Sequence, residues 1–215
     1  MLPSTLRRLS GLSAVAAGPL CIIGGLLHPI ADGHAHNAEA LTQPHALGSG
    51  ALLLGTVLLL LGLPGVYGWI APRTGALGLA GFLLYFLGNL LSAIPHLVLM
   101  TFAATDLAEH HPGMLSEQDA VIGVPAFETE QLVSGLTLVL GLLVLGIALV
   151  RAEGLPRWLG WTAVAAALAN FVPLPVLPLV TGLQIELLRG VVLVGLGLLA
   201  IRSARAERLT PSLVA

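Results

Sequence analysis

The chain has 215 residues, of which 56% are hydrophobic and only 9% are charged, and its mean hydropathy is +0.96. A soluble domain of this length carries roughly a quarter charged residues, so the composition excludes an ordinary globular protein. It also excludes a disordered chain, which would be polar. The formal net charge of −2 offers no basic surface for nucleic acid, and a single cysteine, Cys21, excludes an internal disulfide.

Long apolar segments follow one another along the chain. A hydrocarbon core about 30 Å thick is crossed by about 20 helical residues. Segments of this kind cover residues 10–30, 46–71, 75–104, 130–150, 158–176 and 181–202. The uncharged stretch from Trp158 to Ile185 is broken by Pro173, Pro175 and Pro178, which end a helix and separate the fifth segment from the sixth. The sequence therefore predicts an all-α polytopic membrane bundle of about six transmembrane helices in a single domain.

The arginines predict the orientation, because cytoplasmic loops are enriched in positive charge. With the N-terminus inside, eight of the nine arginines fall on the cytoplasmic side, and Arg189 alone lies within a span. Most of the acids and all seven histidines fall at or beyond the outer half of the bilayer. We therefore expect both termini in the cytoplasm.

Polar and aromatic side chains share one face of the third span. At 100° per residue, this stripe is about 80° wide and becomes more polar toward the outer surface. It consists of Phe82, Tyr85, Asn89, Ser92 and His96. Because lipid offers no hydrogen-bond partner, the stripe must face other helices or a wet cavity. It either lines a pocket or ties neighbouring helices together through Asn89 and Ser92.

Three ionisable residues lie within the outer half of the predicted bilayer or at its edge. Counted from Arg202, Glu186 and Arg189 lie about 24 and 20 Å up the last helix. Charges at this depth indicate a functional site by default, although a self-neutralised pair three residues apart would also explain them. Glu130 lies at the outer end of the fourth span, where it is either a functional acid or the solvated start of a helix.

The outer histidines raise the question of a metal. His28, His45 and His96 lie at the ends of three spans, and neutral imidazoles suit zinc or copper. No HExxH or HxxxH motif is present, however. We therefore predict no metal and no cofactor, and assign the histidines a surface role or a pH-sensitive role.

Short motifs resemble those of a loose group of small, mostly uncharacterised multi-pass membrane proteins from actinobacteria. They are Arg7-Arg8 before the first span, Leu27-His28-Pro29 closing it, His45 opening the second span and Pro156-Arg157-Trp158 before the fifth. The resemblance implies a bacterial plasma-membrane bundle and no established activity. In size and span count alone, the chain also looks like small membrane terpene cyclases, which use embedded carboxylic acids to protonate an olefin or epoxide.

Two functions fit these observations. The first is a membrane-embedded enzyme, such as a cyclase, acting on an isoprenoid or another lipid. Glu186 or Glu130 would be the general acid and His96 its partner base. The full set of candidates is Glu186, Glu130, His96 and Arg189 for catalysis, and Phe82, Tyr85, Asn89, Ser92 and Trp161 for substrate binding. The second function is a transporter, or a metal- or proton-sensing protein, with an outward-facing pocket of histidines and acids.

An accessory subunit whose polar groups only organise packing is a third, plainer interpretation. In every case the lipid bilayer is the expected partner, and for the enzyme an apolar small molecule is added. No protein partner is indicated by the sequence.

Overall fold

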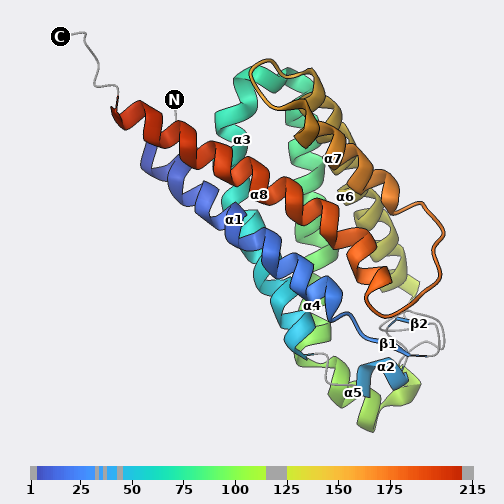
Figure 1. Ribbon diagram of the computed structural model, residues 1–215. Coiled ribbons are helices and arrows are strands. Elements are labelled where there is room, and N and C mark those ends of the chain that lie inside the picture. The colour runs from blue at the N-terminus through green and yellow to red at the C-terminus, as the bar shows by residue number, and fades with distance from the viewer. Residues whose placement is uncertain (1–3, 32–33, 36–37, 43–45, 115–124, 210–215) are drawn as a thin grey trace.

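The computed structural model describes residues 4–31, 34–35, 38–42, 46–114 and 125–209, and these are helical apart from one short strand pair and the connecting loops (Figure 1). The elements are α1 (Ser4–Leu26), β1 (Ile30–Ala31), β2 (His34–Ala35), α2 (Ala38–Thr42), α3 (Ala46–Gly88), the π-helix η1 (Asn89–Ala93), α4 (Ile94–Phe102), α5 (Ala104–His110), the 3-10 helix η2 (Pro112–Met114), α6 (Pro125–Arg151), α7 (Arg157–Ala169) and α8 (Val180–Leu209). The predicted all-α fold is confirmed.

Four helical stretches of the described chain are long and apolar enough to cross a membrane. They are Ser4–Leu26, Leu47–Phe102, Pro125–Arg151 and Val180–Glu207. These stretches are compatible with a membrane protein. They include most of the apolar segments that the sequence predicted, with different bounds and in a different grouping.

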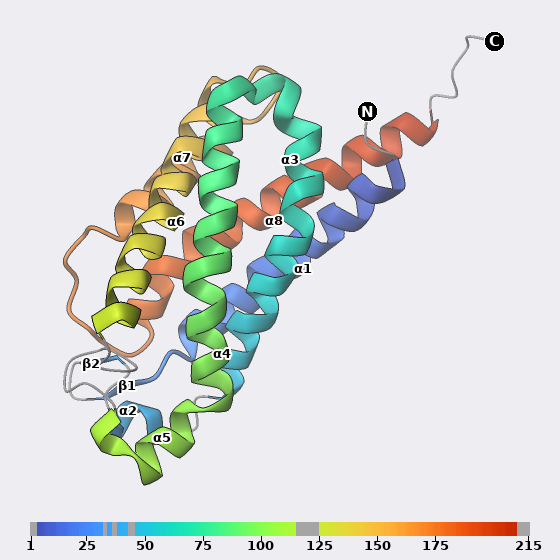
Figure 2. The same cartoon turned by 180° about the vertical axis from the view of Figure 1, so that it is seen from behind.

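The second stretch is a helical hairpin. It contains 56 residues, far more than the about 20 that one crossing needs. The chain reverses at Gly75, where φ is 58° and ψ is −154°, and the two limbs then run antiparallel (Figure 2). Glycine adopts this positive φ without the steric cost that a Cβ would add. The predicted segments 46–71 and 75–104 are therefore the two limbs of one hairpin.

Only part of the predicted fifth span, residues 158–176, is helical. α7 ends at Ala169, and its 13 residues extend about 20 Å, less than the thickness of a hydrocarbon core. The apolar composition continues beyond this point, but Pro173, Pro175 and Pro178 lack the backbone N–H that a helix requires. The first span also ends earlier than predicted, at Leu26, so that His28 lies beyond the helix.

Helices α1 and α8 lie side by side and antiparallel, so that the start of α1 and the end of α8 share one end of the bundle (Figure 1). Glycines allow this close approach: a Cβ added at Gly18 would lie 2.6 Å from the carbonyl oxygen of Gly190. At the shared end, the guanidinium of Arg7 donates two hydrogen bonds to the carboxylate of Glu207, of 2.7 and 2.8 Å.

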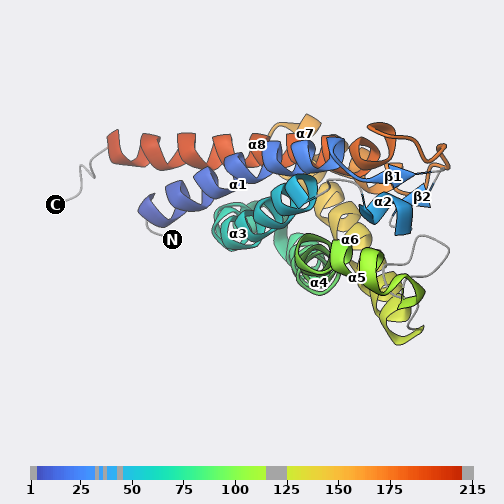
Figure 3. The same ribbon diagram turned by 90° about the horizontal axis from the view of Figure 1, so that it is seen from below.

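The other helices complete the bundle. α1 and α8 lie side by side, α3 packs against α1, and α7 packs against α8; α6 packs between α3 and α7 (Figure 3). At the end remote from the start of α1, the strands β1 and β2 and the short helices α2 and α5 gather (Figures 1 and 2). Here Leu41 packs with Met100, Ala104 and Ala108. We call this the capped end. The residues Ser116-Glu117-Gln118-Asp119 resemble a capping box, which predicts the start of a short helix, and they lie outside the described residues.

Candidate functional site

A cavity of about 270 Å³ lies toward the capped end, where α1, α3, η1, α4, α6 and α8 meet. More than half of its lining residues are polar or charged, which is unusual inside a bundle of apolar helices. These are His28, Thr56, Ser92, His96, Gln131, Glu186 and Arg189; the rest of the lining is Leu52, Ala93, Leu97, Gly182 and Ile185. Since the polar residues come from the loop after α1 and from α3, η1, α4, α6 and α8, only the folded bundle brings them together.

Glu186 and Arg189 form the charged wall of the cavity. Their exposed fractions are 7% and 4%. The Nε of Arg189 lies 3.0 Å from Oε2 of Glu186, which is ion-pair distance, although the two atoms are not aligned for a hydrogen bond. The Nη2 of Arg189 donates instead to Sγ of Cys21 on α1, over 3.5 Å. The pair that the i, i+3 spacing permits is therefore formed, and it faces a cavity.

Two histidines line the same cavity. His28 follows the end of α1, and its Nδ1 lies 3.3 Å from the carbonyl oxygen of Pro29. In the tautomer with a proton on Nδ1, this nitrogen donates a hydrogen bond to that oxygen. His96 lies in the first turn of α4. His45 lies outside the described residues. Among the residues that are described, no group of three or more His, Cys, Asp or Glu side chains is placed to hold a metal ion.

Gln131 connects the cavity to Glu130. The Ser92 hydroxyl donates to Oε1 of Gln131 over 3.4 Å, and Nε2 of Gln131 donates to Oε2 of Glu130 over 2.6 Å. Glu130 itself is not among the lining residues. Its carboxylate therefore reaches the cavity through the amide of Gln131.

The π-helix η1 divides the predicted stripe of the third span. Ser92 and His96 line the cavity, whereas Tyr85 and Asn89 are buried in the protein interior. Asn89 Nδ2 donates to the carbonyl oxygen of Tyr85 over 2.7 Å. The π-helix bonds residue i to i+5, so its wider turn breaks the 100° periodicity on which the stripe was predicted. Such turns are frequent at functional sites.

The predicted aromatic substrate-binding residues Phe82, Tyr85 and Trp161 do not line this cavity. Phe82 stacks on Tyr67 with the ring centroids 4.3 Å apart. The hydroxyl of Tyr85 is buried without a hydrogen-bond partner in the described part of the chain. Trp161 on α7 is 60% exposed. An exposed tryptophan on an apolar helix faces the surroundings of the bundle, which in a membrane are lipid.

Thr56, Gln131 and Cys21 belong to the site but were not singled out from the sequence. Thr56 is wholly buried, and its hydroxyl has no hydrogen-bond partner among the described residues. A signal was present for Thr56, which interrupts the apolar run from Leu52 to Leu63. No sequence signal marks Cys21, because its role depends on Arg189, 168 residues away.

Comparison with known proteins identifies no family for this chain: no family model matches it, and neither does a curated protein or a solved structure. The fold and the cavity define a structural class instead. The chain is an all-α bundle with membrane-length apolar helices and a charged cavity toward one end.

Proposed function

We propose that the chain is a bacterial plasma-membrane protein that crosses the bilayer six times, with both termini in the cytoplasm. The hairpin of α3 supplies two crossings, and α1, α6 and α8 one each. α7 supplies the remaining, shorter crossing, and residues 170–179 lead from its end to the start of α8 at the outer surface. Four segments lie away from the capped end, which supports this topology (Figure 1). They are the start of α1, the turn at Gly75, the loop 152–156 and the end of α8. Those segments carry the arginines that mark a cytoplasmic face.

In this orientation the cavity lies in the outer half of the membrane, and we infer that it is the active site of a membrane-embedded enzyme. One observation carries this inference: a carboxyl group, Glu186, and an imidazole, His96, line a single cavity among membrane-length apolar helices. Ionisable groups are costly there and are found mainly where they have a function. Paired carboxyl and imidazole groups are common general acids and bases.

The proposed reaction is the cyclisation or isomerisation of a small isoprenoid or similar lipid. Glu186, ionised in its resting pair with Arg189, acts as the acid once it has taken up a proton. It then gives that proton to one atom of the substrate while His96 takes one from another, and transfer of the proton from His96 back to Glu186 restores the site, so the formula of the substrate is unchanged. Arg189 orients the carboxyl group, and Ser92 and Gln131 bind a polar head. A volume of about 270 Å³ is below the roughly 300–1,000 Å³ of sites for drug-sized ligands, so the substrate is short.

The experiment uses the purified full chain, reconstituted in vesicles, and a panel of short isoprenoid alcohols and epoxides. Products of unchanged mass are separated by liquid chromatography and detected by mass spectrometry. We expect Glu186→Gln and His96→Ala each to lower the rate by about 10²–10⁴-fold. The matched control is Glu128→Gln, which neutralises an exposed acid at the start of α6 and keeps the wild-type rate.

Wild-type rates in both Glu186→Gln and His96→Ala would contradict the acid and base roles of these two residues. No conversion of any panel member by the wild-type chain would contradict the enzyme for this substrate class. Normal insertion and helix content of each variant, measured by circular dichroism, separates loss of turnover from loss of fold.

A second function is favoured by the presence of both His28 and His96 in the cavity beside a charged pair. These groups suit a transporter, or a binding protein that responds to pH, because histidine changes charge near neutrality. Binding or flux of a small cation or solute would then change between about pH 5 and 7. It would be lost in His28→Ala and in His96→Ala, and the ligand would be recovered chemically unchanged. Flat pH behaviour would contradict this second function.

A further inference from the structure

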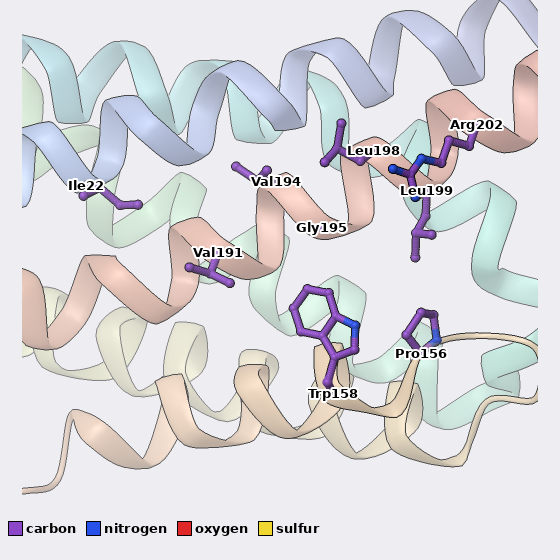
Figure 4. A pocket seen from close by; sticks show the side chains of 9 residues that line it. All are labelled: Ile22, Pro156, Trp158, Val191, Val194, Gly195, Leu198, Leu199 and Arg202. Atoms are coloured by element: carbon purple, nitrogen blue, oxygen red, sulfur yellow. The ribbon is translucent and has the colours of Figure 1, made fainter.

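A second hollow, of about 360 Å³, lies between α8, α1 and the start of α7 (Figure 4). Its floor is the outer face of α8, from Val191 through Val194 to Leu198. Ile22 of α1 borders one side and Trp158 of α7 the other. Apart from Arg202 at one end, these side chains are apolar. We call this hollow the lipid-facing groove.

The groove exists because α8 carries a glycine opposite a tryptophan. A Cβ added at Gly195 would lie 3.0 Å from Cη2 of Trp158 and would also meet the side chain of Leu159. Without that Cβ, the indole ring reaches α8 at Gly195 and forms a wall of the groove (Figure 4). Trp158 is nevertheless 51% exposed, so the wall borders the outside of the bundle rather than its interior.

The length of the groove matches one leaflet of a bilayer. From Val191 to Arg202, α8 advances about 17 Å. This distance is close to half of a hydrocarbon core about 30 Å thick. Arg202 lies toward the C-terminal end of α8, which is cytoplasmic in the proposed orientation. The groove therefore spans the hydrocarbon region of the cytoplasmic leaflet, which contains the acyl chains of single lipids.

The positive charge of Arg202 at the end of the groove favours a lipid with an anionic head group. Arg202 is exposed, as is Arg157, which lies next to Trp158 at the same end. Neither arginine forms an ion pair within the described residues. A guanidinium binds phosphate through two parallel hydrogen bonds. Basic residues at the cytoplasmic surface attract anionic lipids, and tryptophan is enriched at that interface.

We propose that the lipid-facing groove binds one anionic phospholipid of the cytoplasmic leaflet. One acyl chain lies along Val191, Val194 and Leu198, and the phosphate contacts Arg202. The inference rests on the membrane orientation proposed above but not on the chemistry of the cavity. It therefore stands if the chain is not an enzyme.

The test is native mass spectrometry of the purified full chain in a mild detergent. The chain is titrated with phosphatidylglycerol and with phosphatidylcholine of identical acyl chains, and the fraction carrying one lipid is measured. Wild type is expected to prefer phosphatidylglycerol several-fold. Arg202→Gln should lower the affinity for phosphatidylglycerol about fivefold and leave that for phosphatidylcholine unchanged. The matched control is Arg205→Gln, which removes an exposed arginine of α8 that does not line the groove.

A second variant tests the acyl-chain site. Val191 is 37% exposed, so Val191→Trp fills the groove from outside without entering the helix interfaces. It is expected to lower the affinity for both lipids while circular dichroism and size-exclusion behaviour remain those of wild type. Equal affinity of wild type for the two lipids would overturn the proposal. Equal losses in Arg202→Gln and Arg205→Gln would also overturn it, because binding would then reflect diffuse surface charge. Undiminished binding by Val191→Trp would exclude the groove.

Discussion

Breaking the ion pair between Glu186 and Arg189 tests whether these charges depend on each other inside the bundle. Arg189→Met removes the guanidinium and leaves the carboxylate in a buried position. Glu186→Gln does the reverse while keeping the shape of the side chain. The double variant removes both charges together. Because both residues are more than nine-tenths buried, solvent cannot replace the missing partner in either single variant.

The distance of 3.0 Å between Nε of Arg189 and Oε2 of Glu186 sets the size of the expected loss of stability. With an effective dielectric constant of about 20, two unit charges at this distance attract each other by about 5 kcal/mol. Desolvation of both groups offsets much of this attraction in the intact pair. Removing one partner of a buried pair costs about 3–5 kcal/mol, because the other charge is left uncompensated. The double variant should lose only about 0–2 kcal/mol, so the coupling free energy of the cycle is at least about 4 kcal/mol in magnitude.

The assay is equilibrium unfolding of the purified chain in mixed micelles with an increasing fraction of a denaturing detergent. Far-ultraviolet circular dichroism follows loss of helix. The four proteins of the cycle are compared at the same temperature, and the control is Glu128→Gln, whose carboxylate is exposed on α6. Losses that add, so that the double variant is as unstable as the sum of the two singles, would refute the interaction. Single variants as stable as wild type would show that both charges are solvated.

Four further substitutions, one of them a control, test the packing of the bundle by the same unfolding assay. Gly18→Leu should lower the free energy of unfolding by about 1–3 kcal/mol, because a Cβ there would lie 2.6 Å from the carbonyl oxygen of Gly190. In the control Gly50→Ala, the nearest atom to the added Cβ would be 3.9 Å away, so the free energy of unfolding should change by less than about 0.5 kcal/mol. Equal losses in the two variants would contradict the close contact of α1 with α8. Gly75→Val should cost about 1–3 kcal/mol because φ of 58° with ψ of −154° is a conformation that residues with a Cβ rarely adopt, and a neutral effect would show a different turn. Thr56→Val should leave stability within about 0.5 kcal/mol, since its buried hydroxyl has no hydrogen-bond partner in the described chain; a loss above about 1 kcal/mol would reveal one.

Several features of the fold follow from the sequence alone. Scarce charge and long apolar runs predict a helical bundle for a membrane, because a backbone in lipid must satisfy its own hydrogen bonds. The turn between the limbs of α3 was placed within a few residues of Gly75. The i, i+3 spacing of Glu186 and Arg189 predicted that the two side chains share a face, and the structure pairs them.

Other features are decided by tertiary structure. Helical periodicity assigns a residue to a face of its own helix but does not say which helix covers that face. The glycine contacts of α1 with α8 place Cys21 beside Arg189, and the π-helix η1 separates Asn89 from Ser92, although the sequence put both on one stripe. Hydropathy also misplaced the end of α7, since prolines stop a helix without making the segment polar.

The cavity shows most clearly which features the sequence predicts and which depend on tertiary structure. The sequence by itself determined that a few polar groups lie in an apolar chain, among them His96 and Glu186, and it predicted their depth along the helices. Which of these groups meet was decided by packing: Gln131 and Thr56 line the cavity with them, whereas Tyr85 does not. The physical reason is that burial and helix length depend on local composition, while a binding site depends on distances between side chains far apart in the chain.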